Sequence, residues 1–129
     1  MKQEDFIAGL KEFGIIDEYG LYARVNIIYS ETAQVISAMV SNYNSQGTPG
    51  VVGVFNDFLV LYEFATFSPK PKTEIFRVPL TQVEFVSLKP TIFNISKILR
   101  IKVEGRKVKL VAPGKFKNAL ETIANKIQR

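Results

Sequence analysis

The segment VVGVFNDFLVLYEFATF, residues 51–67, decides the fold class of this chain. Two runs of β-branched and aromatic residues flank the dipeptide Asn56-Asp57, a composition that predicts two strands joined by a tight turn. Outward from this hairpin, similar runs are separated by turn-forming residues. They predict further strands at residues 34–43, 73–80, 82–89, 97–104 and 107–112, with loops at residues 44–50 and 68–72. The sequence therefore predicts seven antiparallel strands in a meander.

Helices are predicted towards both ends of the chain. Over residues 3–13 apolar residues recur at helical spacing, and Gly14 follows as a stop signal. Near the other end, a continuous apolar stripe predicts a helix over residues 114–127. We expect this helix to cover the open end of the curled sheet. Its stripe consists of Phe116, Ala119, Leu120, Ile123, Ala124 and Ile127.

Residues 17–30 fit two descriptions. Leu21, Val25 and Ile28 fall on one face of a helix that Asp17 would cap, whereas the run RVNIIY is rich in residues typical of strands. We favour the helix for this segment.

Composition limits the size of the fold and its chemistry. With 129 residues, 47% of them hydrophobic, the chain is long enough for one compact domain. It has no Cys and no His, which excludes disulfides, thiolate chemistry, imidazole catalysis and the commonest metal ligand. No apolar run approaches the roughly 18 residues of a membrane span, and the first residues lack a signal-peptide pattern. We therefore expect an unexported, soluble, cytoplasmic protein.

Seven strands followed by one C-terminal helix resemble the pleckstrin-homology (PH) superfold, specifically the bacterial PH-like domains. GVVGVFNDFLVLYEF is similar to their second hairpin, FRVPLTQVEFVSL to the step into their fifth strand, and LRIKVEGRKVKLV to their sixth and seventh strands. The resemblance implies a mainly β domain over residues 32–129, a seven-stranded antiparallel barrel or sandwich capped by the C-terminal helix. Residues 1–31 would be a helical N-terminal extension.

Two departures from that superfold concern its lipid site. Phosphoinositide-binding members carry spaced basic residues in the first hairpin loop, whereas residues 41–50 contain none. The chain also lacks the Trp of the eukaryotic C-terminal helix. The resemblance therefore does not imply inositol-lipid recognition, and the superfold alone assigns no function.

Charge is distributed unevenly along the chain. Residues 1–66 hold three cations and eight acids, a net charge of −5, whereas residues 67–129 hold fourteen cations and four acids, a net charge of +10. Such asymmetry can attract nucleic acid, an anionic membrane, an acidic protein or the opposite end of a second copy.

Much of the positive charge lies in the hairpin of residues 97–112. A two-residue turn at Gly105-Arg106 is predicted, which would leave like charges facing each other on the exposed side, a mildly destabilising arrangement. The alternative interpretation is a solvated edge whose lysines prevent aggregation between sheets. The predicted cross-strand pairs are Glu104 with Lys107, Lys102 with Lys109, and Arg100 with Val111.

Two more cations follow the hairpin. Lys115 and Lys117 fall in the first turn of the predicted C-terminal helix, where cations oppose the helix dipole and a bound anion would be favoured. The candidate residues for binding an anion or an anionic partner are Arg100, Lys102, Lys107, Lys109, Lys115 and Lys117.

Aromatic residues cluster in the N-terminal extension. Tyr is enriched in the cores of protein interfaces, so this amphipathic segment is a candidate surface for self-association or partner docking. The alternative is that these side chains pack the extension onto its own sheet. The candidate interface residues are Phe6, Leu10, Phe13, Tyr19 and Tyr22.

These patterns together predict a non-enzymatic interaction domain. We assign no catalytic residue, metal ligand or cofactor, and we expect no small-molecule substrate. The expected partner is a protein or a second copy of the chain. The alternative is an anionic lipid surface, which would make the protein peripheral to the membrane. Nucleic acid is disfavoured because the basic strands lack exposed aromatic residues between their cations.

Overall fold

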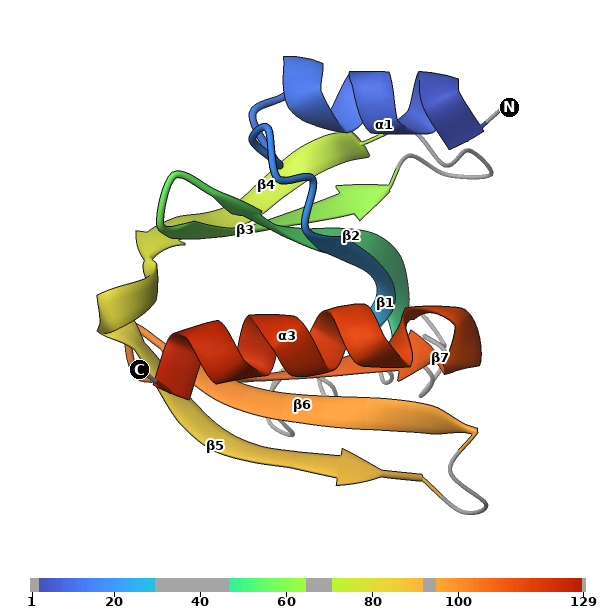
Figure 1. Ribbon diagram of the computed structural model, residues 1–129. Helices are drawn as coiled ribbons and strands as arrows, with labels where there is room; N and C mark the ends of the chain where they lie inside the picture. The colour runs from blue at the N-terminus through green and yellow to red at the C-terminus, as the bar shows by residue number, and fades with distance from the viewer. Residues whose placement is uncertain (1–2, 30–46, 65–70, 92–94, 129) are drawn as a thin grey trace, which may run out of the picture.

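The computed structural model describes residues 3–29, 47–64, 71–91 and 95–128. Within these ranges the fold is mainly β, with seven antiparallel strands in one sheet, an N-terminal helix and a C-terminal helix (Figure 1). The elements are α1 (Gln3–Glu12), β1 (Tyr22–Tyr29), β2 (Thr48–Phe55), β3 (Phe58–Phe64), β4 (Pro71–Pro79), η1 (Leu80–Gln82), β5 (Val83–Pro90), β6 (Ser96–Val103), β7 (Arg106–Pro113), η3 (Gly114–Phe116) and α3 (Lys117–Gln128).

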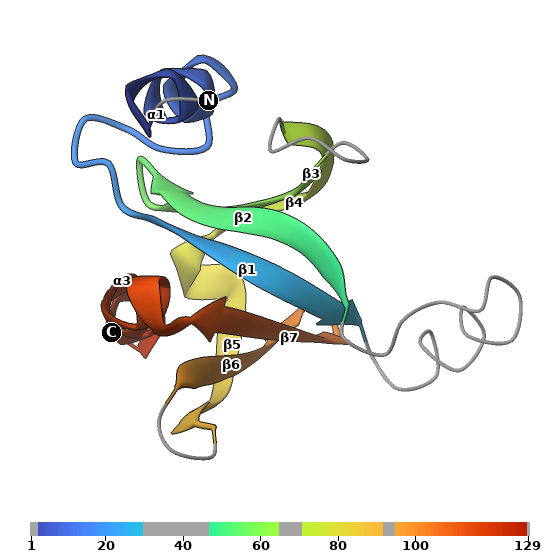
Figure 2. The same ribbon diagram turned by 90° about the vertical axis from the view of Figure 1, so that its right-hand side faces the viewer.

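The strands follow the order β4-β3-β2-β1-β7-β6-β5 across the sheet. β4 and β5 are its two edges, so the sheet is not closed into a barrel. β1 pairs with β2 on one side and with β7 on the other. It thereby joins a half made of β2–β4 to a half made of β5–β7, and the two halves diverge strongly (Figures 1 and 2).

The main core fills the space between the halves, and α3 covers it. The side of the sheet that faces this core is called the inner face, and the opposite side the outer face. Apolar side chains from the inner faces of both halves pack against the predicted stripe of α3, which confirms the C-terminal helix. The buried members of that stripe are Leu120, Ile123, Ala124 and Ile127.

A second, smaller core lies on the outer face of the first half, beneath α1. Phe6 and Leu10 of α1, together with Ile15 and Ile16 that follow it, pack against β2 and β3. The chain approaches β2 closely at Gly53, where a Cβ atom would lie 2.5 Å from the carbonyl oxygen of Ile15. The absence of a side chain at this position lets the N-terminal segment lie against the strand.

The helix predicted over residues 17–30 is wrong, since β1 occupies residues 22–29. Ala23, Val25 and Ile27 are buried, whereas Arg24 and Asn26 between them are exposed. This alternation has the period of a strand, and the neighbouring β2 and β7 satisfy the backbone hydrogen bonds that a helix would make internally. The predicted helical extension over residues 1–31 is therefore wrong over residues 22–29, which form the central strand of the sheet.

The other strand predictions are largely confirmed. Asn56 and Asp57 form the predicted tight turn, with positive φ angles of 46° and 69°. The predicted loops are shorter than expected, because residues 48–50 belong to β2 and residues 71–72 to β4. The strand predicted at residues 34–43 lies outside the described ranges, and the first of the seven strands along the chain is β1.

Asp17 does not cap a helix. One of its carboxylate oxygens accepts a hydrogen bond from the backbone N–H of Tyr19 at 2.9 Å, and the other accepts one from the N–H of Asn56 at 3.0 Å. The carboxylate thus ties the segment after α1 to the β2–β3 turn. None of the helices in the part of the chain described is long and apolar enough to cross a membrane.

Candidate functional site

The turn between β6 and β7 determines which cations face each other. It is formed by Glu104 and Gly105, whose φ angles are 52° and 79°, so the predicted turn at Gly105-Arg106 is wrong by one residue. Positive φ at both central residues is the geometry whose twist matches a right-twisted hairpin, and Gly occupies the second position. Arg106 consequently belongs to β7, opposite Val103.

The corrected register changes every predicted pair on this hairpin. Lys102 lies opposite Lys107 instead of Lys109, and Arg100 lies opposite Lys109. Glu104 is in the turn, so the predicted Glu104–Lys107 pair does not form. Because each partner changes by two residues, no side chain changes face. Two pairs of like charges therefore stand directly opposite each other, where one was predicted.

The predicted division between buried and outward-facing residues on this hairpin is confirmed. Leu99, Ile101, Val103, Val108 and Leu110 are buried against the main core. The cations that alternate with them lie on the outer face of the second half. The predicted set on this side is Arg100, Lys102, Lys107 and Lys109.

β5 contributes two charged residues that are not among those predicted from the sequence. Lys89 lies opposite Ile98 and Glu84 opposite Lys102 in the register, so both share the outer face with the hairpin cations. Their position on this face follows from the pairing of β5 with β6. The spacing of residues within one strand does not reveal that pairing. We call the set Lys89, Arg100, Lys102, Lys107 and Lys109 the basic face.

The basic face is poorly neutralised. Lys102 Nζ lies 3.8 Å from Glu84 Oε2, and the two side chains are 40% and 66% exposed. An exposed pair of this kind contributes little, about 0–1 kcal/mol. The other four cations of the basic face make no ion pair with any residue that the structure describes.

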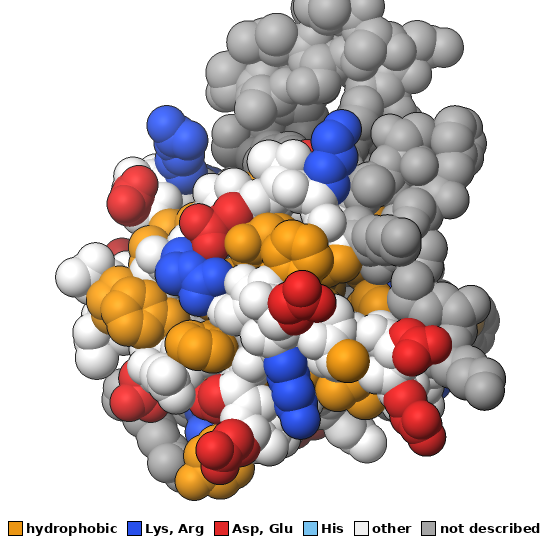
Figure 3. All heavy atoms as spheres, turned by 90° about the horizontal axis from the view of Figure 1, so that it is seen from above, with side chains coloured by type: hydrophobic (Ala, Val, Ile, Leu, Met, Phe, Trp, Pro, Cys, Tyr) orange, Lys and Arg blue, Asp and Glu red, His pale blue; other side chains and the backbone are white. Residues whose placement is uncertain are grey.

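The α1 side of the molecule differs in its charge. There, acidic and basic side chains are interspersed around exposed hydrophobic ones (Figure 3). Glu4, Asp5 and Glu12 of α1 are all exposed. Charge is therefore distributed unevenly in space as well as along the sequence, because the cations of β5–β7 gather on the outer face of the second half.

Lys115 and Lys117 are separate from the basic face. Lys117 is the first residue of α3, which covers the inner face of the sheet. Lys115 lies in η3, and its Nζ is 5.9 Å from the ring centroid of Phe116. The structure therefore brings together four of the six predicted anion-binding residues.

The five candidate interface residues occupy different environments. Phe6 and Leu10 are buried in the smaller core, as the alternative interpretation expects. Tyr22 is half-buried, with its ring 5.8 Å from that of Phe6. Phe13 and Tyr19 are exposed, at 46% and 94%. If the folded N-terminal extension docks a partner, the exposed side chains of Phe13 and Tyr19 are the candidate residues that can contact it.

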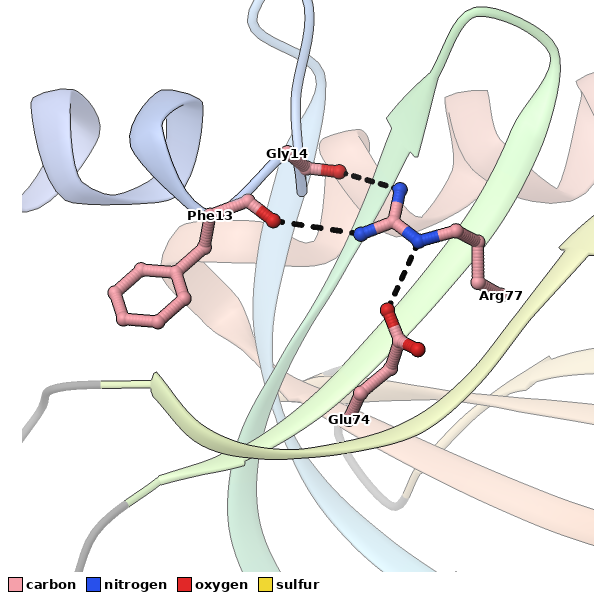
Figure 4. A network of polar contacts seen from close by, with 4 residues as sticks. All are labelled: Phe13, Gly14, Glu74 and Arg77. Carbon is pink, nitrogen blue, oxygen red and sulfur yellow. Dashed lines mark hydrogen bonds and ion pairs between the residues drawn. The ribbon is translucent and has the colours of Figure 1, made fainter.

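Arg77 of β4 fastens the end of α1 to the sheet (Figure 4). Its guanidinium donates to the carbonyl oxygen of Gly14 at 2.7 Å, more weakly to that of Phe13 at 3.4 Å, and to Glu74 Oε1 at 2.9 Å. A cation close to the last carbonyl groups of a helix is also favoured by the helix dipole.

No group of three or more acidic, Cys or His side chains that could hold a metal ion occurs among the residues described. No family model matches the chain, and no curated protein matches its sequence.

Proposed function

We propose that this protein is a non-enzymatic, PH-like interaction domain that docks an acidic protein surface through its basic face. The observation that carries the proposal is the direct opposition of Arg100 to Lys109 and of Lys102 to Lys107. Like charges directly opposite each other destabilise a sheet. An anionic partner would remove that repulsion on binding.

The spacing of the cations suits an extended acidic segment. Arg100 and Lys102 are two residues apart on β6, and Lys107 and Lys109 are two apart on β7. Alternate side chains of any extended chain repeat at about 6.5–7 Å, and neighbouring strands lie about 4.8 Å apart. Carboxylates at alternate positions of a bound extended segment would therefore have the same spacing as the cations of one strand.

The PH-like assignment rests on architecture. Seven antiparallel strands are followed by one C-terminal helix that covers the core between the two halves of the sheet. This architecture agrees with the resemblance in the hairpin sequences.

An anionic membrane is the second candidate partner. Val86 on the edge strand β5 is 48% exposed, and Ile95 before β6 is 65% exposed. A surface that combines exposed apolar side chains with cations suits a lipid headgroup region, where each cation near the surface contributes about 1 kcal/mol.

A charge reversal at one position tests the function. Lys109→Glu places a carboxylate opposite Arg100, and Lys126→Glu makes the same change of net charge on α3. We expect Lys109→Glu to weaken binding of poly-L-glutamate at least tenfold more than the control does, with wild-type affinity falling steeply as salt rises. The unfolding temperature should stay unchanged or rise, because opposite charges replace like ones.

The same binding measurements distinguish an acidic protein, an anionic membrane and a second copy of the chain as the partner. Tighter binding to phosphatidylserine vesicles than to poly-L-glutamate would favour the membrane. Concentration-dependent association of the pure protein in sedimentation velocity, lost in Lys109→Glu, would identify a second copy as the acidic partner. Equal effects of the two substitutions would show that net charge alone acts, and would refute a role for the basic face.

A further inference from the structure

The sheet opens between β1 and β7. These strands pair only through residues 26–29 of β1 and 108–111 of β7. Residues 22–25 of β1 continue alongside β2 alone, while the chain after β7 turns through η3 into α3. An open groove of about 470 Å³ lies at this division, between Arg24, Val25 and Asn26 on one side and Pro113, Lys115 and Phe116 on the other.

The lining of the groove combines positive charge with apolar walls. Among the described residues that line it, Arg24 and Lys115 are the two charged ones and none is acidic. Most of the remaining surface is apolar, from side chains that include Phe64, Ile95 and Phe116. Small-molecule sites are typically concave and mostly apolar, with a few polar groups that orient the ligand, and span about 300–1,000 Å³.

The Arg24 guanidinium is held by aromatic rings. Its central carbon lies 5.4 Å from the ring centroid of Phe6 and 5.4 Å from that of Phe64. Such contacts attract the cation to the ring faces without using its N–H donors. Arg24 is exposed and makes no ion pair with any residue described. A guanidinium held on aromatic rings, whose donors bond none of the described residues, can orient a carboxylate or phosphate.

Aromatic contacts fix the groove relative to both helices. The ring of Phe6 in α1 lies 6.0 Å from that of Phe64 and 5.8 Å from that of Tyr22. Tyr22 in turn lies 5.7 Å from Phe116, just before α3. The walls of the groove therefore belong to packed elements and exist before any ligand binds.

We propose that this groove binds a small amphipathic anion, a molecule with one carboxylate or phosphate group on an apolar body. The headgroup lies between Arg24 and Lys115, and the body lies against Phe64, Phe116 and Ile95. The groove and the basic face share no residue. This site is therefore additional to the proposed docking function and does not depend on it.

The test uses the full chain and four probes, with amide chemical shifts as the readout. Octanoate and octyl phosphate carry both parts of the predicted ligand, 1-octanol lacks the charge, and acetate lacks the apolar body. We expect saturable shifts at the amides of Val25, Asn26 and Phe116 with one or both amphipathic anions. Comparison of those two identifies the headgroup. Acetate and 1-octanol should bind at least tenfold more weakly.

Charge-removing variants locate the site. Arg24→Gln and Lys115→Gln should each lower the affinity for the preferred anion at least fivefold, whereas Lys126→Gln on α3 should not change it. Because Arg24 also packs against Phe6 of α1, its replacement could loosen that helix. Lys115→Gln removes the other charge of the groove without altering this contact. Lys109→Glu should leave this affinity unchanged, which separates the groove from the basic face. Absence of saturable binding, equal binding of 1-octanol, or an affinity that neither variant lowers would overturn the proposal.

Discussion

Arg77 shows how one side chain can anchor a whole segment. It is the only described residue whose side chain donates hydrogen bonds to the backbone where α1 ends, at Phe13 and Gly14. The guanidinium also lies 5.8 Å from the ring centroid of Phe55 in β2. Its planar fork serves several acceptors at once, which the single ammonium of a lysine does less well.

We predict that Arg77→Ala lowers the free energy of unfolding by about 1–3 kcal/mol, the range for losing hydrogen bonds from a charged donor. Urea denaturation measures this loss. Hydrogen exchange should also accelerate at the amide of Ile15, which donates to the carbonyl oxygen of Leu10 at 2.8 Å. Lys72→Ala on the same strand is the control and should change stability by less than about 0.5 kcal/mol. A loss no larger than the control's would contradict this role.

At the scale of elements, the β6–β7 hairpin shows what sequence patterns can predict. Alternation of apolar and charged residues correctly assigned each side chain to a face, because that assignment depends only on the period of a strand. The cross-strand partners depend on the turn, and both Glu104-Gly105 and Gly105-Arg106 give registers with the same faces. Residue spacing could not distinguish them.

Glu104→Asn tests the observed turn. A residue with a left-handed conformation costs roughly 1–2 kcal/mol, and Asn tolerates it better than Glu. We therefore expect the free energy of unfolding to rise by up to about 1 kcal/mol. Arg106→Asn serves as the comparison, because Arg106 lies in β7 and Asn is disfavoured in strands. If Arg106→Asn were the stabilising change instead, the hairpin would turn at Gly105-Arg106.

For the whole molecule, β1 is the element on which both halves of the sheet depend. The sequence predicts residues 22–29 as part of the helical N-terminal extension, because three apolar residues fit a helical face. What decides their structure is non-local, namely the edges of β2 and β7 on either side. The choice between the two interpretations of the N-terminal aromatic residues is non-local too, since only the folded sheet shows that Phe6 and Leu10 are covered.

Two truncations follow from this dependence. Deleting residues 1–31 removes β1 and should abolish the folded sheet in circular dichroism. Deleting residues 1–16 removes α1 but keeps β1, and should leave a folded sheet with lowered stability. The second truncation exposes Val51, Val60 and Phe64, so we expect it to associate in sedimentation velocity more than the full chain does. A folded protein after the first deletion would contradict the central role of β1.

The position of β1 also orders events during synthesis. Its partner β2 follows after a short interval, but the pairing of Tyr29 with Val108 must wait until about 80 more residues have been made. At a typical elongation rate this is a delay of roughly 4–16 s. During that time one edge of β1 lacks its partner β7, while β2–β4 can already assemble on the other. The nascent chain would then be open to mispairing at that edge, and chaperones that shield strands would act before β7 emerges from the ribosome.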